Sequence, residues 1–327
     1  MVFFSSYFQS LVDEDPLPTL GDYSSASISL SGEYSLGRIW LSMYRGSTKE
    51  HSDPLMRTYL EDLIYRLSET SEVRDRRFEF IILEDKTINA FAAPGGIIGI
   101  NLGMFLNTEK EGELASVMCH ELAHLSQRHY ARSQNKVSPL ANALMVLGSI
   151  AVAAASRNPE AILIAPAAMQ QMSINFTRSN EKEADRIGFN NLVKAGFNPD
   201  DMTMMFQRMQ SKYQNEDSEQ FSYLMTHPLP SERLSDMRIR ADSLKKTAKN
   251  SFRDNIDFYF MQKRAEIWAN KDLKKLIRNY KKDQKSEIKN ISYSGSYGLS
   301  LAYKNLNDFD KSFSLLRKLI KEIPNNL

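Results

Sequence analysis

The residues with the clearest potential for chemistry form the pentapeptide His120-Glu121-Leu122-Ala123-His124. Histidines four positions apart project from one face of a helix, so both imidazoles can bind a single Zn²⁺ ion. Glu121 is then displaced toward the open coordination position, where it can accept a proton from a water molecule that the metal acidifies. The spacing predicts a catalytic site for peptide hydrolysis with one Zn²⁺ per chain; the alternative is a chance pattern on an amphipathic helix.

A third protein ligand is expected from the acidic stretch NEKEAD at residues 180–185. Glu181 and Asp185 are four positions apart, so one carboxylate can bind the metal while the other orients a ligating imidazole. We predict that Glu181 is the ligand and that Asp185 contacts His120. Glu183 points about 200° away on the helical wheel and is the poorer ligand. Without the histidine motif, such carboxylates would be the solvated face of a charged helix.

The next histidine, His129, lies nine residues after His120, a rotation of about 180° on a continuous helix. We therefore predict that it is no ligand and that it lies at the surface or contacts a second helix. His51 has no partner motif.

The elements that must position these residues can be predicted from hydrophobic periodicity. A helix over Pro54–Leu67 precedes three short strands, with a turn at residues 94–96 before the last of them. Long helices follow, the last of them closed by Gly196. The strands are expected at Phe78–Leu83, Ile88–Phe91 and Ile97–Ile100, and the helices at Glu111–Ser133, Ser138–Ser156 and Pro159–Lys194. Residues 12–50 are rich in Ser, Gly and Asp, which predicts an irregular lead-in with a short helix near Glu33–Tyr44. The expected fold is mainly α with a small β-sheet.

The longest apolar run, Leu140–Ala155, falls short of the ~20 residues that a membrane-spanning helix needs. It is either a buried core helix, or a lid or an element in peripheral contact with a membrane beside the cleft, since an exposed apolar face would promote aggregation in free solution. The two readings stay open.

Composition is that of a globular protein, with 42% hydrophobic and 25% charged residues. The 42 basic and 40 acidic side chains give a net charge of +2, too balanced for nucleic-acid binding. The single cysteine, Cys119, excludes an intramolecular disulfide. No complete signal peptide is visible in the first eleven residues, so the chain is either cytosolic or begins within or after a leader.

The C-terminal region becomes polar and lysine-rich beyond Ala241. From Gly295 to Asn325, small and large residues fall at the offsets of one helix-turn-helix unit, which resembles a tetratricopeptide repeat (TPR). A solitary repeat cannot bury both of its faces. Either residues 253–281 form a degenerate partner or further repeats follow a truncated end.

The motif VMCHELAHLSQRH, followed further along by RSNEKEADRIG, resembles the signature of the gluzincin metallopeptidases of the HtpX/Ste24/OMA1 type. TINAFAAPGGIIGINLGMF and THPLPSERLSDM, together with the repeat, resemble a periplasmic branch of that family. The resemblance is strong over residues 20–245 and weak in the tail. It implies an α+β zincin-like metallopeptidase domain at 51–247, after a lead-in at 1–50 and before a helical TPR-like region at 253–327. Cys119 departs from the small residue, such as alanine, that the family implies.

The family resemblance also implies a function. Members of the branch degrade misfolded or misassembled outer-membrane proteins in the periplasm. The TPR-like region would dock onto such clients or onto the outer-membrane β-barrel assembly machinery. The resemblance further implies that Asn89, Ala90 and Phe91 form a sheet edge that pairs with the substrate backbone.

His227 and Arg233 lie on a proline-stiffened loop that leads into a helix from Ser231. The resemblance places both in the catalytic cleft, where they could stabilise the oxyanion of the tetrahedral intermediate. For Arg233 the alternative is a structural pair with a carboxylate such as Glu232 or Asp236. His227 could also occupy the fourth position on the metal and hold the resting protein in a self-inhibited form.

Two other functions compete with a peptidase: a TPR-based chaperone or adaptor with a self-inhibited or regulatory zinc site, and a structural zinc domain. A structural site has four firm protein ligands and no need of Glu121, so the sequence favours catalysis.

Overall fold

The computed structural model describes residues 28–134, 178–215, 222–245 and 252–324. These residues form mostly helices around one small sheet, which confirms the predicted fold class. The predicted apolar helix at 138–156, the first part of the helix at 159–194 and the domain boundary near residue 250 lie outside the described ranges. Within these ranges, no helix combines the length and hydropathy that crossing a membrane requires.

The sheet has the strand order β1 (Glu79–Leu83), β3 (Ile97–Asn101), β2 (Ala90–Ala93). β1 pairs with β3 in parallel, and β2 pairs with β3 antiparallel with Phe91 opposite Gly99. The three predicted strands are therefore confirmed to within two residues, as is the turn at residues 94–96, where both glycines have positive φ. β2 is an edge strand of this sheet.

A helix is confirmed where the sequence predicts a short one near Glu33–Tyr44, but this helix, α2 (Leu30–Ser47), is longer, so the predicted irregular lead-in is wrong for residues 30–47. Ser29 caps the helix by accepting a hydrogen bond from the N–H of Gly32. A Cβ at Gly37 would lie 2.1 Å from the carbonyl oxygen of Pro94. The glycine that argues against a helix is thus needed for the close approach of α2 to the β2–β3 turn.

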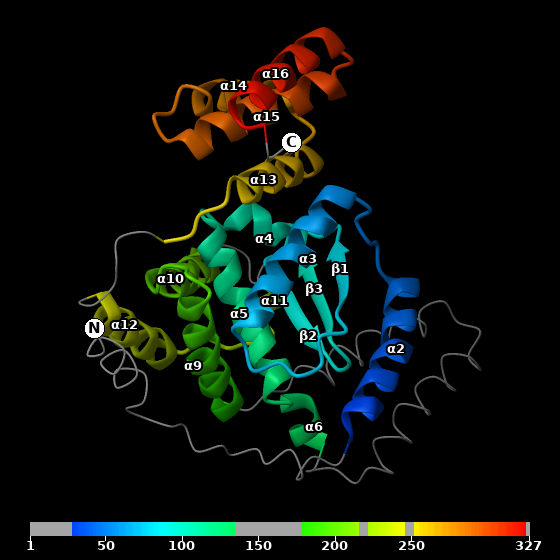
Figure 1. Ribbon diagram of the computed structural model, residues 1–327, viewed down its shortest axis with the longest axis vertical. Helices are drawn as coiled ribbons and strands as arrows, with labels where there is room; N and C mark the ends of the chain where they lie inside the picture. The colour runs from blue at the N-terminus through cyan, green and yellow to red at the C-terminus, as the bar shows by residue number, and fades with distance from the viewer. Residues whose placement is uncertain (1–27, 135–177, 216–221, 246–251, 325–327) are drawn as a thin grey trace, which may run out of the picture.

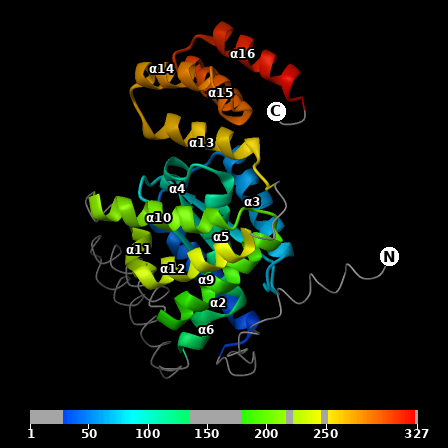
Figure 2. The same cartoon turned by 90° about the vertical axis from the view of Figure 1, so that its left-hand side faces the viewer.

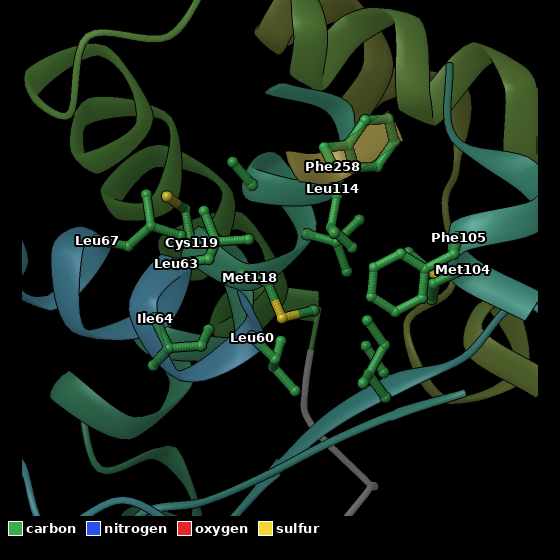
Figure 3. Close-up of a cluster of buried hydrophobic side chains, with 14 of the residues drawn as sticks. Leu60, Leu63, Ile64, Leu67, Met104, Phe105, Leu114, Met118, Cys119 and Phe258 are labelled. Carbon is green, nitrogen blue, oxygen red and sulfur yellow. The ribbon is translucent and has the colours of Figure 1, made fainter. Parts of the chain in front are cut away.

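The hydrophobic core lies between α3 (Pro54–Glu69), α4 (Leu102–Asn107) and α5 (Glu111–Ser126). Figure 3 shows Leu60 and Leu63 of α3 and Met118 of α5 within this cluster, with Phe105 of α4 and Phe258 of α13 (Ile256–Ala269) at its other side. Apart from Leu125, every residue of α5 is buried. The helix that carries the histidine motif is therefore held on all sides.

The chain turns sharply after α5, so the prediction of one helix over Glu111–Ser133 is wrong. α5 ends at Ser126, Arg128 adopts a left-handed conformation with φ 51°, and a second helix, α6, begins at His129 (His129–Gln134). Arg128 Nε donates to Glu33 Oε2 at 3.0 Å, and Nη2 donates to the carbonyl oxygen of Ile28. These contacts with α2 hold a backbone conformation that a residue other than glycine rarely adopts.

The helix α9 (Arg178–Lys194) packs along α5. A Cβ at Gly188 would lie 3.0 Å from backbone atoms of His120, so this glycine lets the two helices touch at the metal motif. Further helices complete the wall around the site: α10 (Asp200–Asn215), α11 (Ser222–Thr226) and α12 (Ser231–Lys245).

Four further helices form the C-terminal region: α13 (Ile256–Ala269), α14 (Leu273–Asp283), α15 (Lys289–Asn305) and α16 (Phe309–Glu322). Figure 1 and Figure 2 show α13 between α14–α16 and the rest of the molecule. Phe258 is fully buried in the main core, and Gln262 donates to the carbonyl oxygens of Phe105 and Thr108. The α15–α16 pair has the predicted helix-turn-helix form; its assignment as a TPR stays a prediction.

Candidate active site

Three elements bring four buried side chains together. His120 and His124 come from α5, Glu181 comes from the first turn of α9, and His227 follows α11. One nitrogen or oxygen atom from each of these residues lies within 4.8 Å of the others. His120 Nε2 lies 2.9 Å from His124 Nε2 and 3.5 Å from Glu181 Oε2, while His227 Nδ1 lies 3.1 Å from Glu181 Oε2.

This donor set fits a divalent metal ion. Imidazole nitrogens and a carboxylate oxygen are ligands that zinc prefers, and in a tetrahedral zinc site such atoms are about 3.4 Å apart. Burial alone would lower the pKa of His120, but Asp185 and Glu181 raise it to about 9. The carboxylates thus give the cluster an affinity for positive charge that a divalent cation can satisfy.

Glu121 lies beside this cluster with 1% of its surface exposed. Its carboxylate accepts a hydrogen bond from the backbone N–H of Ala92, while Oε1 has no hydrogen-bond partner among the described residues. Burial raises the pKa of Glu121, and the nearby His227 and His120 oppose that rise. A carboxylate with a raised pKa is a stronger proton acceptor, which suits a general base.

Arg233 joins two carboxylates of α9. Its Nε and Nη2 donate to Asp185 at 2.6 and 2.7 Å, and its Nη1 lies 2.9 Å from Glu181 Oε2. The alternative of a pair with a carboxylate is therefore met, but by other residues than the two named: Glu232 and Asp236 pair on the protein surface with lysine or arginine of α9. The partner of Arg233 is set by the packing of α12 on α9.

Asp185 lies between Arg233 and the metal motif. Its Oδ1 is 3.0 Å from His120 Nδ1, the contact that the sequence predicts. Burial alone would raise the pKa of Asp185, but Arg233 and His120 hold it below its usual range. The ionised carboxylate can therefore orient His120 with Nε2 toward the other donors. Stabilisation of an oxyanion by Arg233 stays a prediction.

Tyr223 is a site residue that the sequence analysis misses. Its ring stacks on His227 at 4.6 Å between centroids, and its carbonyl oxygen accepts from the N–H of His227 at 2.8 Å. The signal that could have revealed it is its position one helical turn before His227. Tyr223 fixes the ring that faces the cluster.

The register of β2 on β3 decides which residues turn their backbone groups toward the free edge of the sheet, and these are not the three predicted residues. Asn101 N–H donates to the carbonyl oxygen of Asn89 at 2.9 Å. Since hydrogen-bonded pairs alternate along an antiparallel ladder, Asn89 and Phe91 bond to β3, and the backbones of Ala90 and Ala92 point away from it. Of the three predicted residues only Ala90 presents its backbone at this edge, and the pairing of the edge with a substrate stays a prediction.

His129 is fully buried, so its predicted surface position is wrong. The other expectation, a contact with the second helix, is confirmed because Glu183 Oε2 of α9 lies 3.0 Å from His129 Nε2. His51 contacts Glu84 at 3.2 Å, away from the cluster.

Such a metal-binding cluster, with an adjoining carboxylate and a sheet edge, defines a metallopeptidase centre of the gluzincin type. The chain belongs to peptidase family M48, whose model matches residues 54–241.

Several curated proteins are similar to the chain. It is 32% identical over 95% of its length to the Escherichia coli (strain K12) protein "Beta-barrel assembly-enhancing protease" and 33% identical over 96% to the Yersinia pestis protein of the same name. It spans 64% and 65% of the lengths of these relatives. A Schizosaccharomyces pombe protein, "Mitochondrial metalloendopeptidase OMA1", is 27% identical over 58% of this chain and 56% of its own length.

Proposed function

We propose that the protein is a zinc endopeptidase in which His120, His124 and Glu181 hold the metal and Glu121 is the general base. The observation that carries the proposal is the buried Oε1 of Glu121, which accepts no hydrogen bond from the described residues, lies 3.6 Å from His227 Nε2 and stands beside four converging metal donors. A structural zinc site would gain nothing from such a carboxylate. Membership of family M48 supports the same activity.

The side chains divide the reaction between them. When bound, zinc would supply Lewis-acid polarisation of the scissile carbonyl and lower the pKa of a water molecule. Glu121 accepts the proton of the attacking water and can pass it to the leaving amine. The backbone groups of Ala90 and the carbonyl oxygen of Ala92, whose N–H donates to Glu121, hold the substrate as an added strand, so recognition does not depend on side-chain identity.

The substrate class that suits this edge is an unfolded or misassembled polypeptide, because only an extended chain can pair with β2. The names of two relatives mention the assembly of β-barrels, which supports β-barrel proteins as clients. We propose that these clients are outer-membrane proteins and that the location is periplasmic. We further propose that residues 253–327 are a TPR-like region that docks onto clients or onto the β-barrel assembly machinery, outside the metallopeptidase domain at 51–247.

A second candidate function is a chaperone or adaptor whose zinc site is self-inhibited. It is favoured by His227, whose Nδ1 lies 3.4 Å from His120 Nε2 and so stands where a fourth ligand would. The two functions are compatible if His227 can withdraw.

Metal removal tests the enzymatic proposal. We expect 1,10-phenanthroline to abolish cleavage of casein by the full chain and stoichiometric Zn²⁺ to restore it, because Glu121 alone cannot make water a sufficient nucleophile. Zinc content and cleavage would be measured on the same samples. Cleavage that persists in zinc-free protein would contradict the proposal.

The second candidate predicts the effect of His227→Ala. If the imidazole mainly occupies the fourth position in the resting protein, its loss should raise basal cleavage and cause self-digestion, and this is the outcome we expect. If it mainly stabilises the transition state, the rate of cleavage should fall by a factor that corresponds to a few kcal/mol of transition-state free energy. Initial rates of casein cleavage decide, with His51→Ala as the control. Unchanged kinetics would remove both roles.

A further inference from the structure

Behind the cluster of metal donors, His124 contacts His129, which in turn contacts Glu183. Its Nδ1 lies 2.8 Å from Nδ1 of His129, and Nε2 of His129 lies 3.0 Å from Oε2 of Glu183. Arg132 Nη1 donates to the same carboxylate oxygen at 2.9 Å. These residues connect α5, α6 and α9 behind the ligand, and His129 and His124 are buried.

The chemistry of these groups fixes the direction of each hydrogen bond. Paired with Arg132, Glu183 is ionised and can only accept, so His129 must donate from Nε2. In a neutral imidazole the other nitrogen is then an acceptor, so His129 Nδ1 receives the hydrogen of His124 Nδ1. His124 is left with an unprotonated Nε2, the atom that faces His120 and Glu181.

We propose that His129 and Glu183 are positioning residues that set the tautomer and orientation of His124 for metal binding, as Asp185 does for His120. The inference rests on the proposed function, because it treats His124 as a ligand. The last histidine of the motif H-E-L-A-H-L-S-Q-R-H thus has a role that its spacing on a continuous helix would not predict.

The backbone supports the same role. On a continuous helix, a residue five positions after His124 would be rotated by about 140° from it and could not meet its ring. The left-handed turn at Arg128 brings His129 back onto His124, and the buried contact of Arg128 with Glu33 holds that turn. Residues other than glycine rarely adopt this region of φ/ψ, and those that do are concentrated at functional sites.

The test compares zinc affinity of full-length variants by competition with a chromophoric chelator. His129→Phe keeps the ring but removes the acceptor, and we expect zinc affinity to fall by about 10- to 100-fold. His129→Asn places an oxygen where Nδ1 was, so it should recover part of that loss. Co²⁺ absorption spectra report the ligand geometry, which a merely structural role would not change in a folded variant.

The double variant His129→Phe/Glu183→Ala removes the carboxylate that His129→Phe would leave without its imidazole partner, which guards against misfolding. Its zinc affinity should match that of His129→Phe, because coupled residues are not additive. His51→Phe, the same change at the His51–Glu84 pair, should bind zinc as the wild type does.

Wild-type affinity and an unchanged Co²⁺ spectrum in folded His129→Phe would overturn the inference, as would an equal loss in His51→Phe. Either result leaves the proposed function intact as long as the wild type binds zinc and cleaves casein. A wild type that binds no zinc would overturn both.

Discussion

Replacing Glu121 with glutamine should lower peptide hydrolysis by about 10²- to 10⁴-fold while the chain keeps its metal. The amide has nearly the shape of the carboxylate but cannot accept a proton from water. Because Glu121 is not among the four converging donors, zinc content should stay at that of the wild type. Casein cleavage and bound zinc, measured on the same preparation, test both parts of the expectation.

The matched control for this variant is Glu69→Gln, the same substitution at an exposed position near the end of α3. It should cleave casein at the wild-type rate. Turnover by Glu121→Gln at a comparable rate would refute the assignment of the base. Loss of zinc from Glu121→Gln would show instead that this carboxylate supports the metal cluster.

The second large effect is expected from the ligands themselves. Alanine at His120, His124 or Glu181 should remove zinc together with activity, because each supplies one of the converging donor atoms. Metal content by atomic absorption and casein cleavage should fall together. If Glu183→Ala strips the metal and Glu181→Ala does not, the carboxylate ligand is misassigned.

Asp185→Asn provides a graded comparison within the same series. The residue contacts His120 and Arg233 but is not a donor to the metal cluster. We expect a loss of about 10- to 100-fold in metal affinity or activity, smaller than that of any ligand variant. Wild-type metal affinity and activity in Asp185→Asn would show that Asp185 does not help to hold the metal ligands in place.

The part of the site that sequence predicts well is local to single helices. The spacing of His120 and His124, and of Glu181 and Asp185, follows from helical geometry alone, and the structure brings these residues together. Sequence fails for Arg233, whose partner is set by the packing of α12 on α9. Arg233 could be matched only with acidic neighbours on its own helix, whereas helix packing gives it Asp185.

Other misses arise where the backbone departs from regular geometry. The helical wheel places His129 on the far side of the helix only if the helix continues through Arg128. Arg128 instead adopts a positive φ, which its contact with Glu33 of α2 holds. The register of β2 similarly depends on the partner strand. Both features are set by contacts between segments far apart in the chain, which periodicity does not detect.

The position of α13 has a consequence for the proposed docking of clients onto the C-terminal helices. Because Phe258 belongs to the main core and Arg264 bonds to Asp53 ahead of α3, α14–α16 are joined to the metal centre by a rigid support. A client anchored on these helices could reach Glu121 only with an unfolded stretch of chain long enough to bridge the fixed distance between α14–α16 and the active site. A strand already closed into a barrel has no such slack. Under the proposed docking function, cleavage would therefore depend on how much unfolded chain a client offers. Completed barrels would not be cut, whatever their sequence.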